Sequence, residues 1–128
     1  MIKKIHHLGL AVESIDEAAA LFKKLFGAEL HPGYRLDTPE FTSRFLMVGD
    51  KVVFELLEPK GSNGLIERFI KSRGQGIHHV SFHVSDREEV LRKCRALGLT
   101  VLRNRFIHPK GTFGTLIELE EGIKGVDY

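Results

Sequence analysis

Hydrophobic and polar residues alternate in two short segments whose sequences are nearly the same. "IHHLGLAV" occupies residues 5–12, and "IHHVSFHV" occupies residues 77–84. Alternation with a period of two is typical of a β-strand with one buried face. Both segments are therefore predicted to be strands, and each of them begins with Ile-His-His.

A segment with helical periodicity follows each predicted strand. Its apolar residues recur every three or four positions, which places them on one face of a helix. The two apolar stripes consist of Ile15, Ala18, Phe22 and Leu25, and of Val90, Leu91, Cys94 and Leu97. Gly27 and Gly98 follow the stripes, and glycine commonly ends a helix because it adopts the left-handed conformation there.

Both predicted helices also carry the same starting signal. Ser14 lies three residues before Glu17, and Ser85 lies three residues before Glu88. Each pair matches a capping box, in which the two side chains accept hydrogen bonds from backbone N–H groups that have no partner within the helix. The chain therefore contains two copies of one strand–helix unit.

Further strands are predicted after each helix. In the first copy, residues 41–49 and 51–58 are apolar segments joined by a turn at Gly49-Asp50. The corresponding segments of the second copy are residues 99–104, 105–109 and 115–121. The "HPG" at residues 31–33 predicts a turn, because proline and glycine favour turn conformations.

A third helix is predicted to link the two copies, from Ser62 to about Arg73. Its buried side consists of Leu65, Ile66, Phe69 and Ile70. We therefore expect an α+β fold of two tandem βαβββ modules, at about residues 1–59 and 76–121. At 128 residues, the chain is long enough to bury a core as a single domain over residues 1–128.

The second histidine of each Ile-His-His is the candidate for function. On the first strand, His7 shares its face with Gly9 and Ala11, while the larger aliphatic residues lie on the opposite face. On the second strand, His79 likewise lies opposite the aliphatic face. A core histidine with one hydrogen bond is the alternative interpretation, but recurrence at equivalent positions favours a functional pair.

Two glutamates interrupt apolar strand sequences, Glu55 in "VVFELLEP" and Glu118 in "TLIELEE". A buried carboxylate is costly unless it is paired or binds a metal ion. A strand with one solvated face would also explain a single glutamate. However, each module combines one histidine of its first strand with one glutamate of its last strand.

His7, Glu55, His79 and Glu118 would form a closed ligand set if the two modules face each other. Nitrogen and oxygen donors without a thiolate suit a divalent ion such as Co²⁺, Zn²⁺, Ni²⁺, Mn²⁺ or Fe²⁺. Four protein ligands would leave two positions of an octahedron open, enough for a bidentate substrate.

Composition and charge exclude several classes of protein. A net charge of +2 with scattered Lys and Arg argues against nucleic-acid binding. No apolar run approaches the roughly 20 residues of a membrane span. The lone cysteine, Cys94, rules out an internal disulfide and favours a reducing compartment, so we expect a cytoplasmic protein.

These residues resemble the vicinal oxygen chelate superfamily and, within it, the methylmalonyl-CoA epimerases. The matching stretches are "IHHLGLAVESIDEA", "VGDKVVFELLEPKGSNGLIERFIKSRGQGIHHVSFHV" and "HPKGTFGTLIELEE". The resemblance implies an incomplete barrel around one divalent metal ion per chain, an acyl-CoA substrate and a homodimer. It also implies epimerisation by proton transfer at the α-carbon, through a metal-stabilised enolate.

Residue roles also follow from this resemblance. The metal ligands of the family correspond to His7, Glu55, His79 and Glu118, and Glu118 also matches one of two acid/base glutamates. For the second of these, Glu40 in "LDTPEFTSRF" is the nearest candidate. His108 and Lys110 in "HPKGTFG" match a loop near the cavity and are candidate substrate-binding residues, although a plain β-turn would explain the sequence equally well.

The same residues also fit two alternative functions. A His/Glu/His/Glu set also resembles bacterial glyoxalase I, a lactoylglutathione lyase that acts on a thiol–aldehyde adduct. A non-catalytic protein that binds a small ligand in the same cavity is the other alternative. The short second module favours it, because Glu55 follows His7 by 48 residues whereas Glu118 follows His79 by 39.

Overall fold

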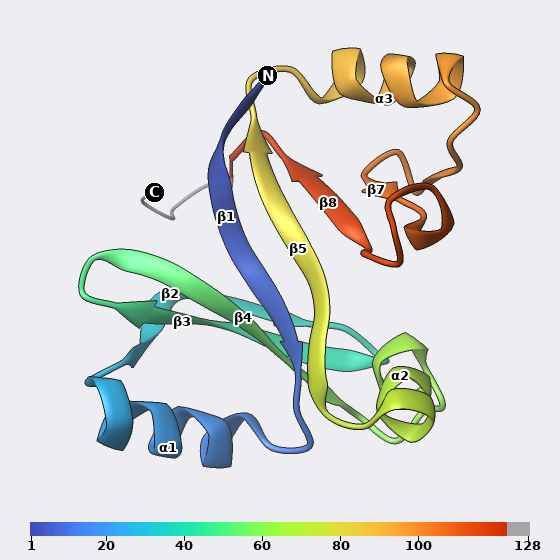
Figure 1. Ribbon diagram of the computed structural model, residues 1–128. Coiled ribbons are helices and arrows are strands. Elements are labelled where there is room, and N and C mark those ends of the chain that lie inside the picture. Colours follow the sequence, from blue (N-terminus) through green and yellow to red (C-terminus); the bar gives the residue numbers. More distant parts are fainter. Residues whose placement is uncertain (123–128) are drawn as a thin grey trace. The chain divides into compact units, whose positions relative to one another are not determined.

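The computed structural model describes residues 1–122 and confirms an α+β fold with two βαβββ modules (Figure 1). The first module consists of β1 (Ile2–Ala11), α1 (Ile15–Phe26), β2 (Glu29–Asp37), β3 (Phe41–Val48) and β4 (Lys51–Pro59). Helix α2 (Leu65–Arg73) follows it. The second module consists of β5 (Gly76–Val84), α3 (Arg87–Ala96), β6 (Val101–Leu102), β7 (Phe106–Ile107), the 3-10 turn η1 (Pro109–Gly111) and β8 (Ile117–Glu120).

The described residues divide into two compact units. Residues 8–78 form one, here called the central unit, and residues 1–7 with 79–122 form the other, here called the terminal unit. Strands β1 and β5 contribute residues to both. The assignment of residues 1–128 to a single domain stays a prediction, and residues 123–128 lie outside the described residues.

Each unit contains an open mixed sheet. In the central unit the strand order is β2-β3-β4-β1, with β1 and β4 parallel and the other pairs antiparallel. In the terminal unit the order is β1-β5-β8-β7-β6, with β5 and β8 parallel. Among the described residues, β2 and β6 are the edge strands. None of the helices within residues 1–122 is long and apolar enough to cross a membrane.

The strand registers repeat between the modules. Glu55 pairs with Gly9 of β1 and with Phe45 of β3. Glu118 pairs in the same way with Ser81 of β5 and with Phe106 of β7. Because Gly9 and Ser81 each lie two residues after the second histidine of Ile-His-His, the register places each histidine and glutamate on neighbouring strands of one module.

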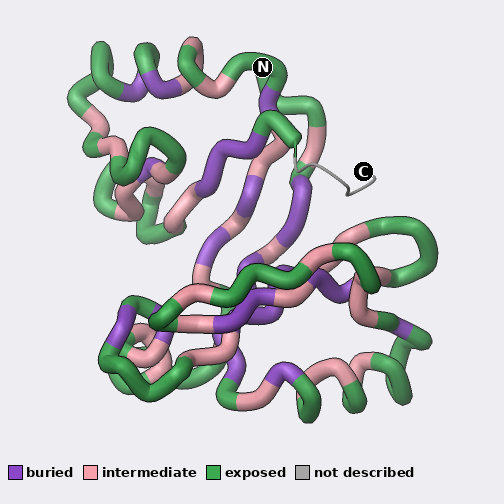
Figure 2. Tube along the Cα trace, turned by 180° about the vertical axis from the view of Figure 1, so that it is seen from behind, coloured by how far each residue is buried: buried purple, intermediate pink, exposed green. Residues whose placement is uncertain are grey.

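The aliphatic faces of β1 and β5 pack under helices, as predicted from their alternation. In the central unit, a core of buried apolar residues forms between α1 and the sheet: Val12, Ile15, Ala28, Leu46 and Leu56. In the terminal unit, the corresponding core includes Val84, Leu91, Cys94, Ile107 and Leu119. A smaller cluster under α2 contains Ala11, Leu57 and Ile66. Figure 2 shows buried stretches in the middle of the sheet, among them the second half of β4 and most of β8, whereas the edge strand β2 is mostly exposed.

The helix caps confirm one prediction and correct another. Ser14 caps α1 by accepting a hydrogen bond from the Glu17 N–H at 3.1 Å, and Gly27 ends the helix with φ of 70°. For α3 the predicted cap at Ser85 is wrong, because Asp86 accepts from the Glu89 N–H at 3.1 Å. The Ser85 hydroxyl instead accepts a hydrogen bond from the Met1 amino group.

Three apolar residues predicted to be buried are exposed: Leu25, Leu65 and Leu97. All three lie in the first or last turn of a helix or just beyond it. Helical periodicity identifies the face that a helix turns toward the sheet, but it does not tell how far along the helix the sheet extends.

Strand β2 corrects the turn predicted at "HPG", because residues 29–37 form a strand. Pro32 and Gly33 are tolerated there since β2 is an edge strand and the register with β3 shifts between Leu30 and Arg35. Proline cannot donate a ladder hydrogen bond and is confined to such edges and irregularities.

Candidate metal centre

The side chains of His7, His79 and Glu118, all in the terminal unit, bring their polar atoms within a few ångströms of one another. The Nε2 atoms of His7 and His79 lie 3.3 Å apart. Oε1 of Glu118 lies 3.4 Å from the first of these atoms and 3.7 Å from the second. All three side chains are buried, so the alternative that Glu118 lies on a solvated strand face is wrong.

The spacing of these atoms fits a divalent metal ion. Ligand atoms about 2.0–2.2 Å from an ion lie roughly 3–3.5 Å from one another, close to the separations found here. Two imidazole nitrogens and a carboxylate oxygen are also borderline and hard donors, which suit a first-row divalent ion.

A second imidazole supports His7. His6 and His7 are joined through their Nδ1 atoms, and the His6 ring also lies edge-on to that of His83, with centroids 6.4 Å apart. Burial, together with the neighbouring imidazoles of His7 and His83, lowers the pKa of His6 to about 4. The contact with His6 holds Nδ1 of His7, so that its Nε2 atom is turned toward Nε2 of His79 and Oε1 of Glu118.

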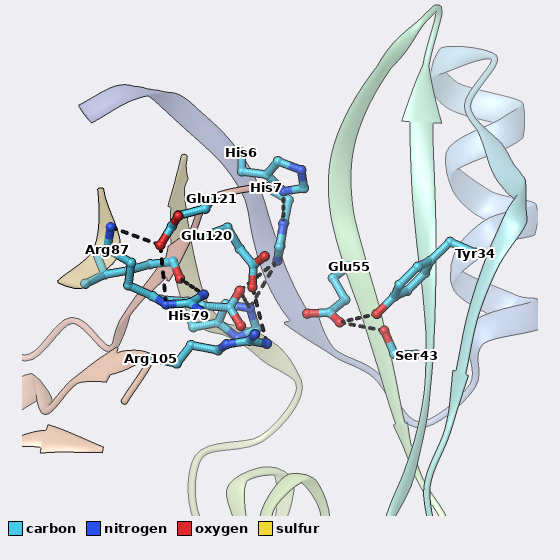
Figure 3. A network of polar contacts seen from close by, with 12 residues as sticks. His6, His7, Tyr34, Ser43, Glu55, His79, Arg87, Arg105, Glu120 and Glu121 are labelled. Atoms are coloured by element: carbon cyan, nitrogen blue, oxygen red, sulfur yellow. Dashed lines mark hydrogen bonds and ion pairs between the residues drawn. The ribbon is translucent and has the colours of Figure 1, made fainter. Parts of the chain in front are cut away.

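Glu55 is a buried carboxylate of the central unit with two hydroxyl neighbours (Figure 3). The Ser43 hydroxyl donates to Oε2 of Glu55 at 2.6 Å, and the Tyr34 hydroxyl lies 3.5 Å from the same oxygen. The alternative of a solvated strand face is therefore wrong for Glu55 as well. These contacts explain how the carboxylate is tolerated between Phe54 and Leu56.

Glu40 lies on the bend between β2 and β3 and is exposed. Its N–H donates to the Thr38 hydroxyl, and its carbonyl accepts from the Lys60 N–H at 3.0 Å. Its side chain covers Gly64, where an added Cβ would lie 2.7 Å from the Glu40 Cβ. Glu40 is thus held against the start of α2, and its role as an acid/base residue stays a prediction.

His108 and Lys110 belong to the terminal unit, at the turn η1. The His108 side chain accepts a hydrogen bond from the Lys110 N–H at 3.0 Å and caps this turn, whereas Lys110 is exposed. The structure therefore shows a capping role for His108. Substrate binding by either residue stays a prediction.

Several polar residues near the candidate ligands were not identified from the sequence. They are Tyr34, Ser43, Ser81, Arg105 and Glu120. Glu120 is buried and lies 3.3 Å from Arg105, and burial followed by the charge of Glu118 raises its pKa. A small polar residue inside an apolar strand, as at Ser43 in "FTSRFLMV", is the signal that could have identified one of them.

Comparison with known proteins places the chain in a family. Residues 6–114 match the model of the Glyoxalase/Bleomycin resistance protein/Dioxygenase superfamily. The ethylmalonyl-CoA/methylmalonyl-CoA epimerase of Cereibacter sphaeroides is 31% identical, over 94% of this chain and 99% of that protein. The mitochondrial methylmalonyl-CoA epimerase of Dictyostelium discoideum is 29% identical, over 94% of this chain and 79% of that protein.

The fold is also found among solved structures. The crystal structure of methylmalonyl-CoA epimerase from Mycobacterium tuberculosis superimposes with a TM-score of 0.80 at 27% identity, over 92% of this chain and 87% of that one. The chain therefore belongs to the glyoxalase/bleomycin resistance protein/dioxygenase superfamily, and it is related to the methylmalonyl-CoA epimerases within it.

Proposed function

We propose that this protein is a divalent-metal-dependent epimerase of methylmalonyl-CoA or a closely similar acyl-CoA. The observation that carries the proposal is the convergence of His7, His79 and Glu118 in a chain related to proteins named for this activity. The same relatives support a small acyl-CoA as the substrate class. Co²⁺, Zn²⁺, Ni²⁺ and Mn²⁺ all suit the donor set.

Glu55 is the proposed fourth ligand. Its support is the repeated register, in which Glu55 and Gly9 pair as Glu118 and Ser81 do. Each module thereby contributes one histidine of its first strand and one glutamate of its last strand. The Glu55 carboxylate is already deprived of bulk water, since the residue is only 9% exposed, and a buried carboxylate favours a cation or hydrogen-bond donors as neighbours.

When bound, a divalent ion would supply Lewis acidity that stabilises the negative charge developing on the thioester oxygen. Glu118 is the proposed acid/base residue on one side of the α-carbon, where its carboxylate takes or returns the proton. Glu40 is the proposed residue for the opposite side. Inversion requires two such groups, because the proton must leave one face and return to the other.

Lys110 and His108 are the proposed substrate-binding residues. An exposed ammonium group suits the carboxylate or the phosphates of an acyl-CoA. The turn η1 fixes the backbone position from which the Lys110 side chain extends. We also propose a homodimer, on the family resemblance, and a cytoplasmic location, because the sequence contains a single cysteine and so needs no oxidising compartment.

The test is proton NMR of methylmalonyl-CoA in D₂O with the protein, metal-loaded and after chelation. Loss of the α-proton signal in the metal-loaded sample alone is expected. A coupled assay that accepts one epimer of the product would then confirm inversion. Absence of exchange with a bound ion, together with thioester formation from methylglyoxal and glutathione, would instead show a glyoxalase-type isomerase.

A further inference from the structure

The proposed function does not explain why two hydroxyl groups, those of Ser43 and Tyr34, contact the carboxylate of Glu55. Strand β3 places Ser43 two residues before Phe45, the residue that faces Glu55 across the antiparallel pair. Residues two apart on a strand share a face, and diagonal neighbours on paired strands are within reach of each other. Ser43 is fully buried, so its hydroxyl has no bulk water to bind in place of the carboxylate.

Both hydroxyl contacts are made to the same carboxylate oxygen. The Ser43 hydroxyl donates to Oε2 of Glu55 over 2.6 Å, which is a short O–H···O distance. The Tyr34 hydroxyl lies 3.5 Å from Oε2, and the Tyr34 ring stacks on Phe45 with centroids 3.9 Å apart and planes at 16°. Two donors on Oε2 fix the plane of the carboxylate and direct Oε1 to the opposite side (Figure 3).

We propose that Ser43 and Tyr34 are positioning residues that hold the Glu55 carboxylate in the orientation required of a metal ligand. Partners behind a ligand fix its geometry, and their loss typically lowers metal affinity by about 10- to 100-fold. This inference rests on the proposed function, because it takes Glu55 as a ligand.

A serine hydroxyl also suits an amide at the same position. Serine both donates and accepts, so it accepts from the amide N–H of a glutamine as readily as it donates to a glutamate. Ser43 therefore remains a partner in the Glu55→Gln variant. A Ser43→Ala variant removes the partner in either case.

The experiment measures Zn²⁺ or Co²⁺ affinity by competition with a chromogenic chelator, with no substrate present. Ser43→Ala is expected to weaken binding by about 10- to 100-fold and Tyr34→Phe by a smaller factor, because the tyrosine contact is longer. Thr42→Val is the matched control. Thr42 is buried on the same strand, and its hydroxyl also donates to a carboxylate, that of Asp37 at 2.9 Å.

A double-mutant cycle separates positioning from a general structural role. In a Glu55→Ala background, Ser43→Ala should cause no further loss of affinity. An equal loss in that background, or unchanged affinity in Ser43→Ala and Tyr34→Phe alike, would overturn the inference. If wild-type protein binds neither ion, the proposed function fails instead. Should Ser43→Ala not fold, Tyr34→Phe carries the same test, because its ring can still stack on Phe45.

Discussion

Glu55 and Glu118 occupy equivalent positions in the two modules but have different neighbours. Each faces a phenylalanine on its antiparallel partner strand and a small residue on its parallel partner strand. The hydroxyls of Ser43 and Tyr34 donate to Oε2 of Glu55, whereas Oε1 of Glu118 lies within 3.7 Å of two imidazole nitrogens. The same backbone position thus supports two different chemical environments.

The length of the neighbouring strands explains part of this difference. In the first module, β2 and β3 are nine and eight residues long, and they supply both hydroxyls. In the second module, β6 and β7 have two residues each. The counterpart of Ser43 there is Asn104, which lies in the exposed turn between β6 and β7 and accepts from Arg95 at 2.9 Å. The shortened second module keeps the glutamate, but an exposed asparagine occupies the position that corresponds to Ser43.

The largest expected effect comes from replacing the two glutamates in turn. Glu118→Gln should lower the rate of α-proton exchange by about 10²- to 10⁴-fold, because an amide cannot act as the base. Glu55→Gln should lower the same exchange rate by no more than about tenfold, because the amide keeps an oxygen acceptor and its hydrogen-bond partner Ser43. Rates of deuterium incorporation measure both. Equal losses in the two variants would show that the environments do not set different roles.

If the two imidazoles near Glu118 bind a metal ion, the ion should raise the free energy of unfolding. At a free metal concentration of 100 times the dissociation constant, the wild type should gain about 2.7 kcal/mol of unfolding free energy. His79→Ala should show no such gain in chemical denaturation with and without Zn²⁺. His78→Ala is the control, because His78 precedes His79 and packs against Phe69, with centroids 5.0 Å apart. A full gain in His79→Ala would exclude it as a ligand.

A smaller effect on stability is expected in the first module, where Glu40 packs against Gly64. Gly64→Ala should destabilise the fold by about 1–3 kcal/mol, since its methyl group would overlap Glu40. A Glu40→Gly background should restore most of this loss, whereas Ser62→Ala on the same loop should have little effect. Urea denaturation measures all of these variants. No recovery in the double variant would show that the strain lies elsewhere.

The smallest expected effect concerns Asp37, an exposed carboxylate that accepts a hydrogen bond from Thr42, the neighbour of Ser43 on β3. Hydrogen bonds from Lys60, Thr42 and Arg35 lower the pKa of Asp37 to about 2. Because the folded-state pKa lies below the unfolded value, this contribution to stability is present above about pH 4 and is lost as the pH falls toward 2. Melting temperatures of Asp37→Asn should therefore match those of the wild type at pH 2 and be slightly lower at pH 6. A constant difference across this range would contradict the assignment.

Local patterns predicted the arrangement of elements along this chain well. Period-two alternation, apolar stripes and glycine stops located β1, α1, α2, β5 and α3, because these signals depend on residues close in sequence. Strand β2 was missed, since Pro32 and Gly33 normally indicate a turn. The cap of α3 was displaced by one residue, because Ser85 and Asp86 are both good caps and the Met1 amino group engages the first.

The amino-acid sequence by itself determined the duplicated module and the residue types at its equivalent positions, including one histidine and one glutamate in each copy. The tertiary structure decided which side chains surround each glutamate. Tyr34, Ser43 and Glu55 come from three strands, and His7 lies more than one hundred residues from Glu118. Contacts of that kind depend on strand register and strand length, and no local pattern of residues encodes them.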